Sequence, residues 1–515
     1  MARDLREQIE HRVREFQQKV DARLSAWSSV RTPVESREME LEIAADARAL
    51  ADGVTEAILR QRVGDVKLQA EATMAAFSDR KFRHGGTRPA AVTLLGGSRV
   101  RLGKLVYAKQ SRRSAPHRRR NGRRGKGGQG FFPVLAALGI WCGATPAVAG
   151  EVCRQVADSD SVRSGRAALD RHGADLGHKQ TLRLVNKFSS RAVLQRAAWL
   201  QRMRDRIPTR GVLCGKRVVL ATDGGRLRER RPARHGRKRT KTGHRRYDAP
   251  WREPKLLVIY VVGEDGKVSE EFRPVYDGTL GDADAIFDMI VGYLKALGAH
   301  QARELIVVGD GAKWIWDRVA SLVERLGIDP KRVKQVIDWC HVVGVLYAIA
   351  EARASWSAAE RDQWLRKAKK LLKRGAIDDL VELIDSLAIG RRAKDISEHR
   401  DYFVRNKNRM QYASFRQAKV PTGSGAIESA VRRVVNMRMK SNGMFWLEVN
   451  AEGMLLLRSY LKAGRLDALV DWSLTAAVPW WHGHAAGARM PASPVQQAPA
   501  TTQKARNATG TAKAA

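Results

Sequence analysis

The chain contains 515 residues, which corresponds to roughly three or four folding units at about 100–200 residues per domain. Lys and Arg number 94 against 54 Asp and Glu, a formal net charge of +40, so we expect a polyanionic partner, with nucleic acid first and an anionic membrane surface second. No run of about 18 uncharged apolar residues would span a bilayer, and no secretory signal is recognisable. The four cysteines lack CxxC spacing, which argues against a disulfide scaffold or a zinc ribbon and favours a cytoplasmic protein.

Residues 1–90 form a predicted N-terminal helical region. Thr32-Pro33-Val34-Glu35 is typical of a helix start, with Thr32 as N-cap and Glu35 as its reciprocal partner. Apolar residues then recur at helical spacing as far as about Arg62. We interpret this region as a helical bundle or an oligomer contact, not as a catalytic element.

Residues 91–130 change character. Short apolar runs between 91 and 108 predict a small β-meander. The basic, Gly-rich segment that follows, from Arg112 to Gly130, indicates either a flexible arm that contacts phosphates or a solvated linker.

Residues 131–208 are predicted to be helical. One helix is expected over 161–169 and another over 178–200, across a short turn that contains glycine. This pattern is similar to a helix-turn-helix, in which Lys179, Arg183 and Lys187 would face DNA. An ordinary helical hairpin is the alternative interpretation.

Strand-like runs dominate the next segment, 209–349, in the order β-β-β-α-β-α-β-α. This order predicts an α/β fold with a mixed five-stranded sheet flanked by helices, in which an antiparallel meander precedes parallel strands. A helical insertion over 350–420, further core helices over 421–475 and a disordered tail over 476–515 complete the expected organisation. The expected strands are 217–222, 255–262, 267–276, 304–308 and 333–337.

Three acidic residues stand at the ends of these predicted elements. Asp223 ends the first strand and Asp310 the fourth, each followed by glycine, and Glu428 opens a helix after a Gly-Ser-Gly turn. Strand ends line the functional crevice of a mostly parallel sheet, and carboxylates are the hard ligands that Mg²⁺ prefers. Two such ions can activate a nucleophile and stabilise the leaving oxygen of a phosphodiester. The alternative is that the aspartates only form turns and that Glu428 only complements a helix dipole.

Four sequence motifs surround these acids: Ala221-Thr222-Asp223-Gly224, Val308-Gly309-Asp310-Gly311-Ala312-Lys313-Trp314-Ile315, Ile337-Asp338-Trp339-Cys340-His341, and Gly423-Ser424-Gly425-Ala426-Ile427-Glu428-Ser429 continuing into Arg438-Met439-Lys440-Ser441-Asn442-Gly443. As a set they resemble the motifs of RNase H-like DDE transposases of bacterial insertion sequences, in the Mutator-like branch with a helical insertion before the last acid. The resemblance covers about residues 210–465 well and the N-terminal part loosely.

The resemblance implies an RNase H-like fold in which Asp223, Asp310 and Glu428 hold two Mg²⁺ or Mn²⁺ ions. It implies an enzyme that cuts the ends of an insertion sequence and joins them to target DNA, with terminal inverted repeats as partners. A homo-oligomer, dimer or larger, would act on nucleoid-associated DNA, with no membrane partner. Relatives often carry Cys and His a few residues apart where Cys340 and His341 are adjacent, which leaves their accessory roles open. No zinc is expected, because the basic segment around 111–127 has no cysteine.

Basic residues near the acids predict DNA contacts. Between Arg226 and Arg246 there are eleven Lys and Arg in twenty-one residues, including Arg237, Lys238 and Arg239. A solvated hairpin is the usual explanation of such a run, but beside Asp223 we favour an arm that follows a DNA backbone. The Glu428 helix adds predicted phosphate contacts at Arg432, Arg438 and Lys440.

Two other functions stay open at this point. A nuclease on the same scaffold would cut without joining, and a non-catalytic DNA-binding protein, such as a silenced transposase acting as a repressor, would bind ends with or without metal. A membrane-surface protein is remote, because the basic segments lack an apolar helix face to insert.

Overall fold

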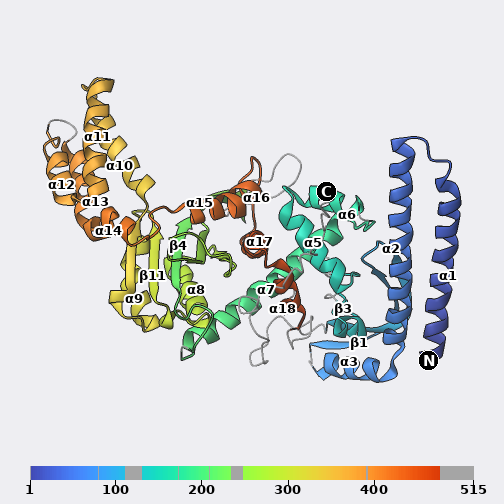
Figure 1. Cartoon of the computed structure of the whole chain (residues 1–515). Helices are drawn as coiled ribbons and strands as arrows, with labels where there is room; N and C mark the ends of the chain where they lie inside the picture. Colours follow the sequence, from blue (N-terminus) through green and yellow to red (C-terminus); the bar gives the residue numbers. More distant parts are fainter. Residues whose placement is uncertain are drawn as a thin grey trace, which may run out of the picture.

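The computed structural model describes residues 2–78, 81–110, 130–171, 173–207, 209–232, 247–389 and 393–475. Most of the predicted basic segment 112–130, the predicted DNA contacts Arg237, Lys238 and Arg239, and the predicted tail 476–515 lie outside these residues. The molecule is elongated, with a helical hairpin at one end, a helical insertion at the other and the main sheet next to the insertion (Figure 1). None of the helices in the described ranges combines the length and apolar character of a bilayer span.

The N-terminal helices are α1 (Ala2–Trp27), α2 (Pro33–Gly64) and α3 (Val66–Ser78). The predicted start of α2 is confirmed: Glu35 N–H donates to Thr32 Oγ1 at 3.2 Å, and Thr32 N–H donates to the Glu35 carboxylate at 3.0 Å. Helix α1 lies alongside α2 and is joined to it by ion pairs, among them Arg23 with Asp46 at 3.0 Å.

A long β-hairpin follows, where the sequence predicted a short meander. Strands β1 (Phe82–Thr93) and β2 (Arg99–Gln110) pair along their whole length, and β3 (Gly130–Phe131) adds to β2. The prediction was too short because two register shifts in the hairpin interrupt the alternation of apolar and polar residues. Buried Asp52 of α2 accepts the N–H groups of Gly96 and Ser98 at 2.9 and 2.8 Å, which fixes the hairpin turn to the helices.

The helices of region 131–208 are present, but α5 to α7 do not form a separate unit. Residues of α5 and α7 belong to the same hydrophobic core as the main sheet. Arg196 of α7 makes buried ion pairs with Asp277 of the sheet at 2.6 Å and with Glu452 of a C-terminal helix at 2.7 Å. A charge pair in such a low-dielectric position holds the two regions together, because neither partner can be exposed separately without leaving a buried charge. The helices are α4 (Pro133–Ala137), α5 (Pro146–Asp158), α6 (Val162–Arg171) and α7 (His178–Asp205).

The main sheet is five-stranded and mixed, as predicted. Its order is β10-β9-β4-β11-β12; β9 runs antiparallel to both of its neighbours, and β4, β11 and β12 are parallel. The third strand was predicted too early. Residues 263–267 form a turn, Val268 makes a single bridge to Val262, and regular pairing begins only after Pro274, which has no N–H to donate. The strands are β4 (Arg217–Gly224), β9 (Lys255–Val262), β10 (Val275–Thr279), β11 (Glu304–Gly309) and β12 (Val333–Ile337).

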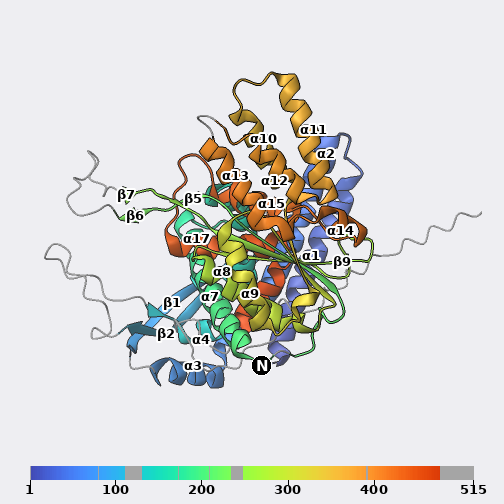
Figure 2. The ribbon, with the colours of Figure 1, turned by 90° about the vertical axis from the view of Figure 1, so that its left-hand side faces the viewer.

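Between β4 and β9 the chain leaves the sheet as an arm, which projects from the body of the molecule (Figure 2). Its described part consists of β5 (Leu227–Arg228) paired with β8 (Trp251–Arg252), and β6 (Arg231–Pro232) paired with β7 (Tyr247–Asp248).

Helices cover the sheet and form the insertion. The segment between β12 and Glu428, where the sequence predicts a helical insertion, consists of helices α10 to α14 and stands at one end of the molecule (Figure 1). The remaining helices are α8 (Ala283–Ala296), α9 (Lys313–Leu326), α10 (Trp339–Ala352), α11 (Ala358–Arg374), α12 (Ile377–Asp385), α13 (Ala393–Asn406), α14 (Tyr412–Gln417), α15 (Gly425–Val431), α16 (Met437–Met439), α17 (Glu448–Lys462) and α18 (Leu466–Thr475), with 3-10 turns η1 (Ala299–Gln301), η2 (Pro330–Arg332) and η4 (Lys407–Arg409).

A π-helical turn, η5 (Arg432–Asn436), joins α15 to α16. Buried Arg458 of α17 donates to the carbonyl oxygens of Val434 at 2.6 Å, Ala157 at 2.5 Å and Arg433. Burial lowers the pKa of Arg458 to about 10. The guanidinium therefore satisfies carbonyl groups at the π-helical turn, which lies directly after the helix that carries Glu428.

Candidate active site

Three aspartates lie at the same level where three neighbouring parallel strands end: Asp223 within the end of β4, and Asp310 and Asp338 just after β11 and β12. Val308 of β11 is the register partner of Ala221 of β4, so Asp310 and Asp223 both come two residues after a paired position. Gly309 is likewise the partner of Ile337, so Asp338 follows β12 as Asp310 follows β11. Neighbouring strands lie about 4.8 Å apart, and the three aspartates therefore share one edge of the sheet.

Asp223 is partly buried at this edge. The N–H of Gly224 donates to Asp223 Oδ1 at 2.6 Å. Burial raises the pKa of the Asp223 carboxyl, and the nearby charges of Asp310 and Glu428 raise it further. The two acids predicted as its companions are thus close enough to influence its ionisation.

Asp310 lies in a tight turn before α9. Its Oδ1 accepts the N–H of Ala312 at 2.9 Å, and its main-chain oxygen accepts the indole N–H of Trp316 at 2.7 Å. The next residue, Gly311, touches Tyr402 of the insertion so closely that a Cβ at 311 would overlap the Tyr402 ring. Burial, then the charges of Asp310 and Asp338, raise the pKa of Tyr402 far above its ordinary value. The insertion therefore reaches the acidic edge, a contact that no sequence pattern indicated.

Glu428 reaches the same edge from α15. Ser424 Oγ donates to Glu428 Oε1 at 2.6 Å, and the N–H of Ser424 donates to Asp338 Oδ2. The N–H of Trp339 also donates to the oxygen of Thr422 at 2.9 Å. The Gly-Ser-Gly turn before Glu428 is therefore hydrogen-bonded to the end of β12, although 86 positions separate Ser424 from Asp338.

Asp338 is the site residue that the sequence prediction left out. It is the N-cap of α10: its Oδ1 accepts the N–H of His341 at 2.8 Å and lies 3.2 Å from His341 Nδ1. Burial opposes its ionisation, but these hydrogen bonds outweigh burial and hold its pKa well below the usual range. The sequence did contain a signal for this residue: Asp338 stands at the end of the fifth strand, as Asp223 and Asp310 stand at the ends of the first and fourth strands.

His341, one of the two residues with an open accessory role, belongs to this edge. Its Nδ1 lies 4.0 Å from Glu428 Oε1, and within the described chain Asp338, His341 and Glu428 are the group whose donor atoms all fall within 4.8 Å of one another. The hydrogen bond to Asp338 raises the pKa of His341, although burial opposes it. Cys340 is exposed and outside this group; burial and the charges of Asp338 and Glu428 raise the pKa of its thiol.

The group of donor atoms within 4.8 Å of one another does not include Asp223 or Asp310, but each of the three predicted metal ligands has a carboxylate oxygen available to a hard divalent cation. The Asp223 and Asp310 carboxylates each use one oxygen for a hydrogen bond to a nearby backbone N–H, and Glu428 uses one for Ser424. Each therefore has a second carboxylate oxygen with no hydrogen bond to another described residue. Oxygen ligands of this kind fit Mg²⁺ or Mn²⁺. Asp338 differs, because hydrogen bonds from His341 and Ser424 occupy both of its oxygens.

The predicted DNA-contacting side chains differ in their exposure. Lys179 and Arg183 are exposed on α7, whereas Lys187 is half-buried with its ammonium 5.0 Å from the centre of the Trp141 ring. Arg432 and Lys440 are exposed near Glu428. Arg438 is a correction: it is 2% exposed, donates to the oxygen of Val156 and stacks on Trp446, because the turn of the helix directs it into the core.

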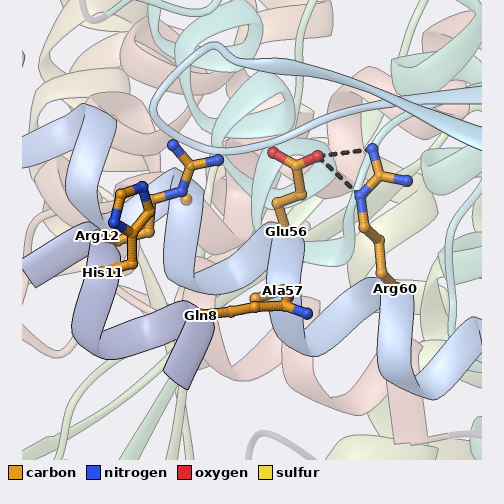
Figure 3. A pocket seen from close by; sticks show the side chains of 7 residues that line it. Gln8, His11, Arg12, Glu56, Ala57 and Arg60 are labelled. Atoms are coloured by element: carbon orange, nitrogen blue, oxygen red, sulfur yellow. Dashed lines mark hydrogen bonds and ion pairs between the residues drawn. The ribbon is translucent and has the colours of Figure 1, made fainter. Parts of the chain in front are cut away.

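A pocket of about 250 Å³ lies between α1 and α2, away from the acids (Figure 3). His11 and Arg12 line it from one helix, and Glu56 and Arg60 from the other, with Glu56 held by Arg60 at 2.7 Å. The single carboxylate in this pocket is neutralised by an arginine, so the pocket lacks the converging acids of the sheet edge.

Comparison with protein-family models, with curated proteins and with solved structures gives no match for this chain.

Proposed function

We propose that the chain is a metal-dependent DNA transposase with an RNase H-like catalytic fold. The observation that supports the proposal is that Asp223 and Asp310 lie at matching positions of neighbouring strands, and that the charges of Asp310 and Glu428 both raise the pKa of Asp223. The strand order supports it, since a three-stranded antiparallel meander followed by two parallel strands is the arrangement predicted from the strand-like runs of the sequence. The helical insertion before Glu428 supports the same branch of the family.

The residues divide the chemistry between them. Asp223, Asp310 and Glu428 would hold two divalent cations, which when bound supply an activated nucleophile and stabilise the leaving oxygen. Asp310 and Asp223 orient their ligand oxygens through the adjacent backbone N–H groups. Ser424 directs Glu428 toward the strands. His341, whose pKa is raised, adds a proton donor or a positive charge beside the acids.

The reaction proceeds in two displacements at phosphorus. Water attacks the phosphodiester at an element end, the P–O3′ bond breaks, and the 3′ oxygen leaves with a proton as a hydroxyl. That 3′-hydroxyl then loses its proton and attacks a target phosphodiester, which forms a new P–O bond and releases the target's own 3′-hydroxyl. No bond to the protein is required in either step.

Surface charge supports DNA as the substrate. Arg432, one helical turn beyond Glu428, is exposed and would contact phosphates that flank the acids, and exposed Lys440 follows α16 farther along the same segment. On this proposal Lys179 and Arg183 of α7 contact the terminal inverted repeats. Two or more subunits would pair the element ends through α1 and α2, where Leu24, Trp27 and Leu41 are exposed apolar residues.

The test is cleavage and joining of DNA that carries the element's ends, with Mg²⁺ or Mn²⁺. Asp223→Asn keeps the side-chain volume but weakens the ligand, so we expect at least about a 1000-fold loss of cleavage, equivalent to several kcal/mol of transition-state stabilisation. Asp265→Asn is the matched control. Asp265 lies in an exposed turn after the last residue of β9, whereas Asp223 lies beside the first residues of that strand.

Four outcomes would contradict the proposal. Cleavage that survives Asp223→Asn, or that persists in EDTA, removes the metal site. Cleavage without any joined product indicates a nuclease, and DNA-end binding with no cleavage of any substrate indicates a repressor.

A further inference from the structure

Arginine and aromatic side chains alternate in a stack at the base of the arm. Arg228 lies over the Trp251 ring at 4.9 Å and over the Phe445 ring at 5.9 Å. Phe445 meets Tyr247 edge to face with ring centres 5.3 Å apart, and Arg230 lies over Tyr247 at 4.5 Å. We call these five residues the arm stack.

The local backbone explains why these side chains meet. Residues 228 and 230 are two apart on an extended segment, so their side chains share one face. Arg228 pairs with Trp251 across β5 and β8. The N–H of Trp446 donates to the oxygen of Arg228 at 2.9 Å, and the N–H of Arg230 donates to the oxygen of Trp446 at 2.6 Å. These bonds bring Phe445 into the stack from a segment some two hundred residues away in the sequence.

Glu229, between the two stack arginines, links the paired strands at the base of the arm. It is buried, and its carboxylate accepts hydrogen bonds from Arg231 at 2.8 Å and forms an ion pair with Arg252 at 3.0 Å. Glu229, the single acid between Arg226 and Arg246, is thus buried and paired with arginines inside the protein. It fixes the paired segments without neutralising Arg228 or Arg230.

Exposure and charge identify the kind of partner. Trp251 is 52% exposed and Tyr247 36%, although each is already covered by an arginine. Arg228 and Arg230 are exposed, and neither has a carboxylate partner in the part of the chain that the structure describes. A surface with flat rings and unneutralised guanidinium groups is complementary to flat, anionic ligands.

Unpaired nucleotides fit this surface better than a duplex. In a duplex both faces of each base are already stacked on neighbours, whereas a single strand offers base faces to aromatic side chains and phosphates to arginines. The arm stack also lies near the acids: Arg228 is five residues beyond Asp223, which at full extension spans at most about 18 Å.

We propose that the arm stack binds an unpaired segment of DNA strand beside the cleavage site. This inference rests on the proposed function for the identity of the nucleic acid. It adds a site that the catalytic proposal does not require, since a transposase could equally cut a fully paired end. The arm stack would hold bases that separate from the duplex next to the cut.

The experiment measures binding alone, with full-length protein in EDTA and fluorescence anisotropy of a labelled oligonucleotide. A single strand of about 20 nucleotides is compared with the duplex of the same sequence. Trp251→Ala combined with Tyr247→Ala should weaken single-strand binding by about 5- to 100-fold, because base–aromatic stacking contributes on that order per base. Duplex affinity should change by less than about threefold, since phosphate contacts dominate it.

Two matched variants keep the result interpretable. Tyr347→Ala removes another exposed ring, 44% exposed on α10, which the Lys369 ammonium covers at 4.3 Å, and it should leave both affinities unchanged. Trp251→Phe retains a ring for stacking, so it should keep most of the single-strand affinity and excludes misfolding as the cause of the loss. Arg228→Gln should lower the salt dependence of single-strand binding, which Trp251→Ala should not.

An equal loss for single strand and duplex, or no loss for either, would overturn the arm stack as a site for unpaired DNA. The cleavage assay separates the two proposals. If Asp223→Asn abolishes cleavage while Trp251→Ala binds single strands normally, only this inference fails. If the arm-stack variants lose single-strand binding while Asp223→Asn still cuts, only the catalytic proposal fails.

Discussion

Asp338 is the residue on which the arrangement of the acidic edge depends most. Its two oxygens accept hydrogen bonds from the start of α10, at His341, and from the turn before α15, at Ser424. One carboxylate therefore connects the end of β12 to the helix that carries Glu428. We infer that Asp338 is a positioning residue, because both of its oxygens are occupied by protein donors.

Replacing Asp338 by Ala should remove the N-cap of α10 and release the Ser424 turn. We expect a loss of about 1–2 kcal/mol of folding free energy, typical of a lost cap. Because Glu428 would no longer be held, metal-dependent cleavage should fall about 10- to 100-fold, the usual effect of removing a group that orients a metal ligand. Urea denaturation measures the loss of folding free energy, and the cleavage assay measures the loss of rate.

The conservative variant separates positioning from general damage. Asp338→Asn keeps one acceptor oxygen and a good N-cap, so it should recover part of both the stability and the cleavage activity that the Ala variant loses. If both variants lose stability but cleave at the rate of the parent protein, Asp338 caps α10 and does not position Glu428.

At the scale of elements, the two ends of the parallel strands differ in charge. The acids lie at the ends of β4, β11 and β12, whereas at the beginnings of these strands Arg217 of β4 pairs with Glu304 of β11 at 2.9 Å. Lys334 of β12 adds a second ion pair to Glu304 at 2.7 Å. This ladder links the three parallel strands that position the acids, and it lies where it cannot disturb a metal site.

The pH dependence of this ladder can be predicted with its sign. Burial opposes ionisation of Glu304, but Lys334 and Arg217 outweigh it and lower its pKa below the ordinary 4.5. A lowered pKa stabilises the folded state above pH 4.5, and this contribution disappears as the pH falls through the folded-state pKa. Glu304→Gln should therefore reduce the free energy of unfolding by about 1–3 kcal/mol near neutral pH, with the difference from the parent shrinking below about pH 4.5.

Urea midpoints measured between about pH 7 and about pH 3 check this expectation. Glu264→Gln is the control, because Glu264 forms a comparable pair with Arg303 on the exposed surface, where solvent screens the charges. A stability difference that grew as the pH fell would contradict the assigned role of Glu304.

For the molecule as a whole, the central question is whether its regions fold separately. One hydrophobic core extends from α5 through the sheet and the insertion to α18, whereas the β1–β2 hairpin and α2 have a small core of their own. Arg196 lies within the large core and joins α7 to Asp277 and Glu452. We therefore expect residues 144–475 to unfold as one cooperative unit.

Arg196→Met should test this expectation. It leaves Asp277 buried without its cation, so we expect a loss of about 3–5 kcal/mol of folding free energy. Adding Asp277→Asn should restore part of that loss, because the uncompensated charge is removed. Arg202→Met, on the exposed side of α7, should change stability by no more than about 0.5 kcal/mol.

Tryptophan fluorescence and far-UV circular dichroism follow the unfolding. Coincident transitions are expected for the large core, and a smaller separate transition is compatible with the N-terminal hairpin region. Two transitions within residues 144–475 would show instead that the α5–α7 helices fold independently of the sheet.

Local chemistry made much of this protein predictable from its sequence. The capping box at Thr32 depends only on neighbouring residues, and four of the five strands were recognisable as short apolar runs bounded by turns. Strand ends also made Asp223 and Asp310 visible, because parallel neighbours bring such positions together. The third strand and the long hairpin were misplaced, since a turn and two bulges interrupt the periodicities on which prediction depends.

Long-range packing decided the rest. Asp338 acts through Ser424, Tyr402 reaches Gly311 from an insertion, and Phe445 completes the arm stack, and each contact joins segments far apart in the sequence. Arg438 and Arg432 look alike in the sequence, yet one is buried and the other exposed, because the direction of a side chain depends on the helix and its neighbours. Residue types and local spacing determine which groups can carry chemistry; only the folded chain determines which of them meet, because contacts between distant segments leave no periodic trace.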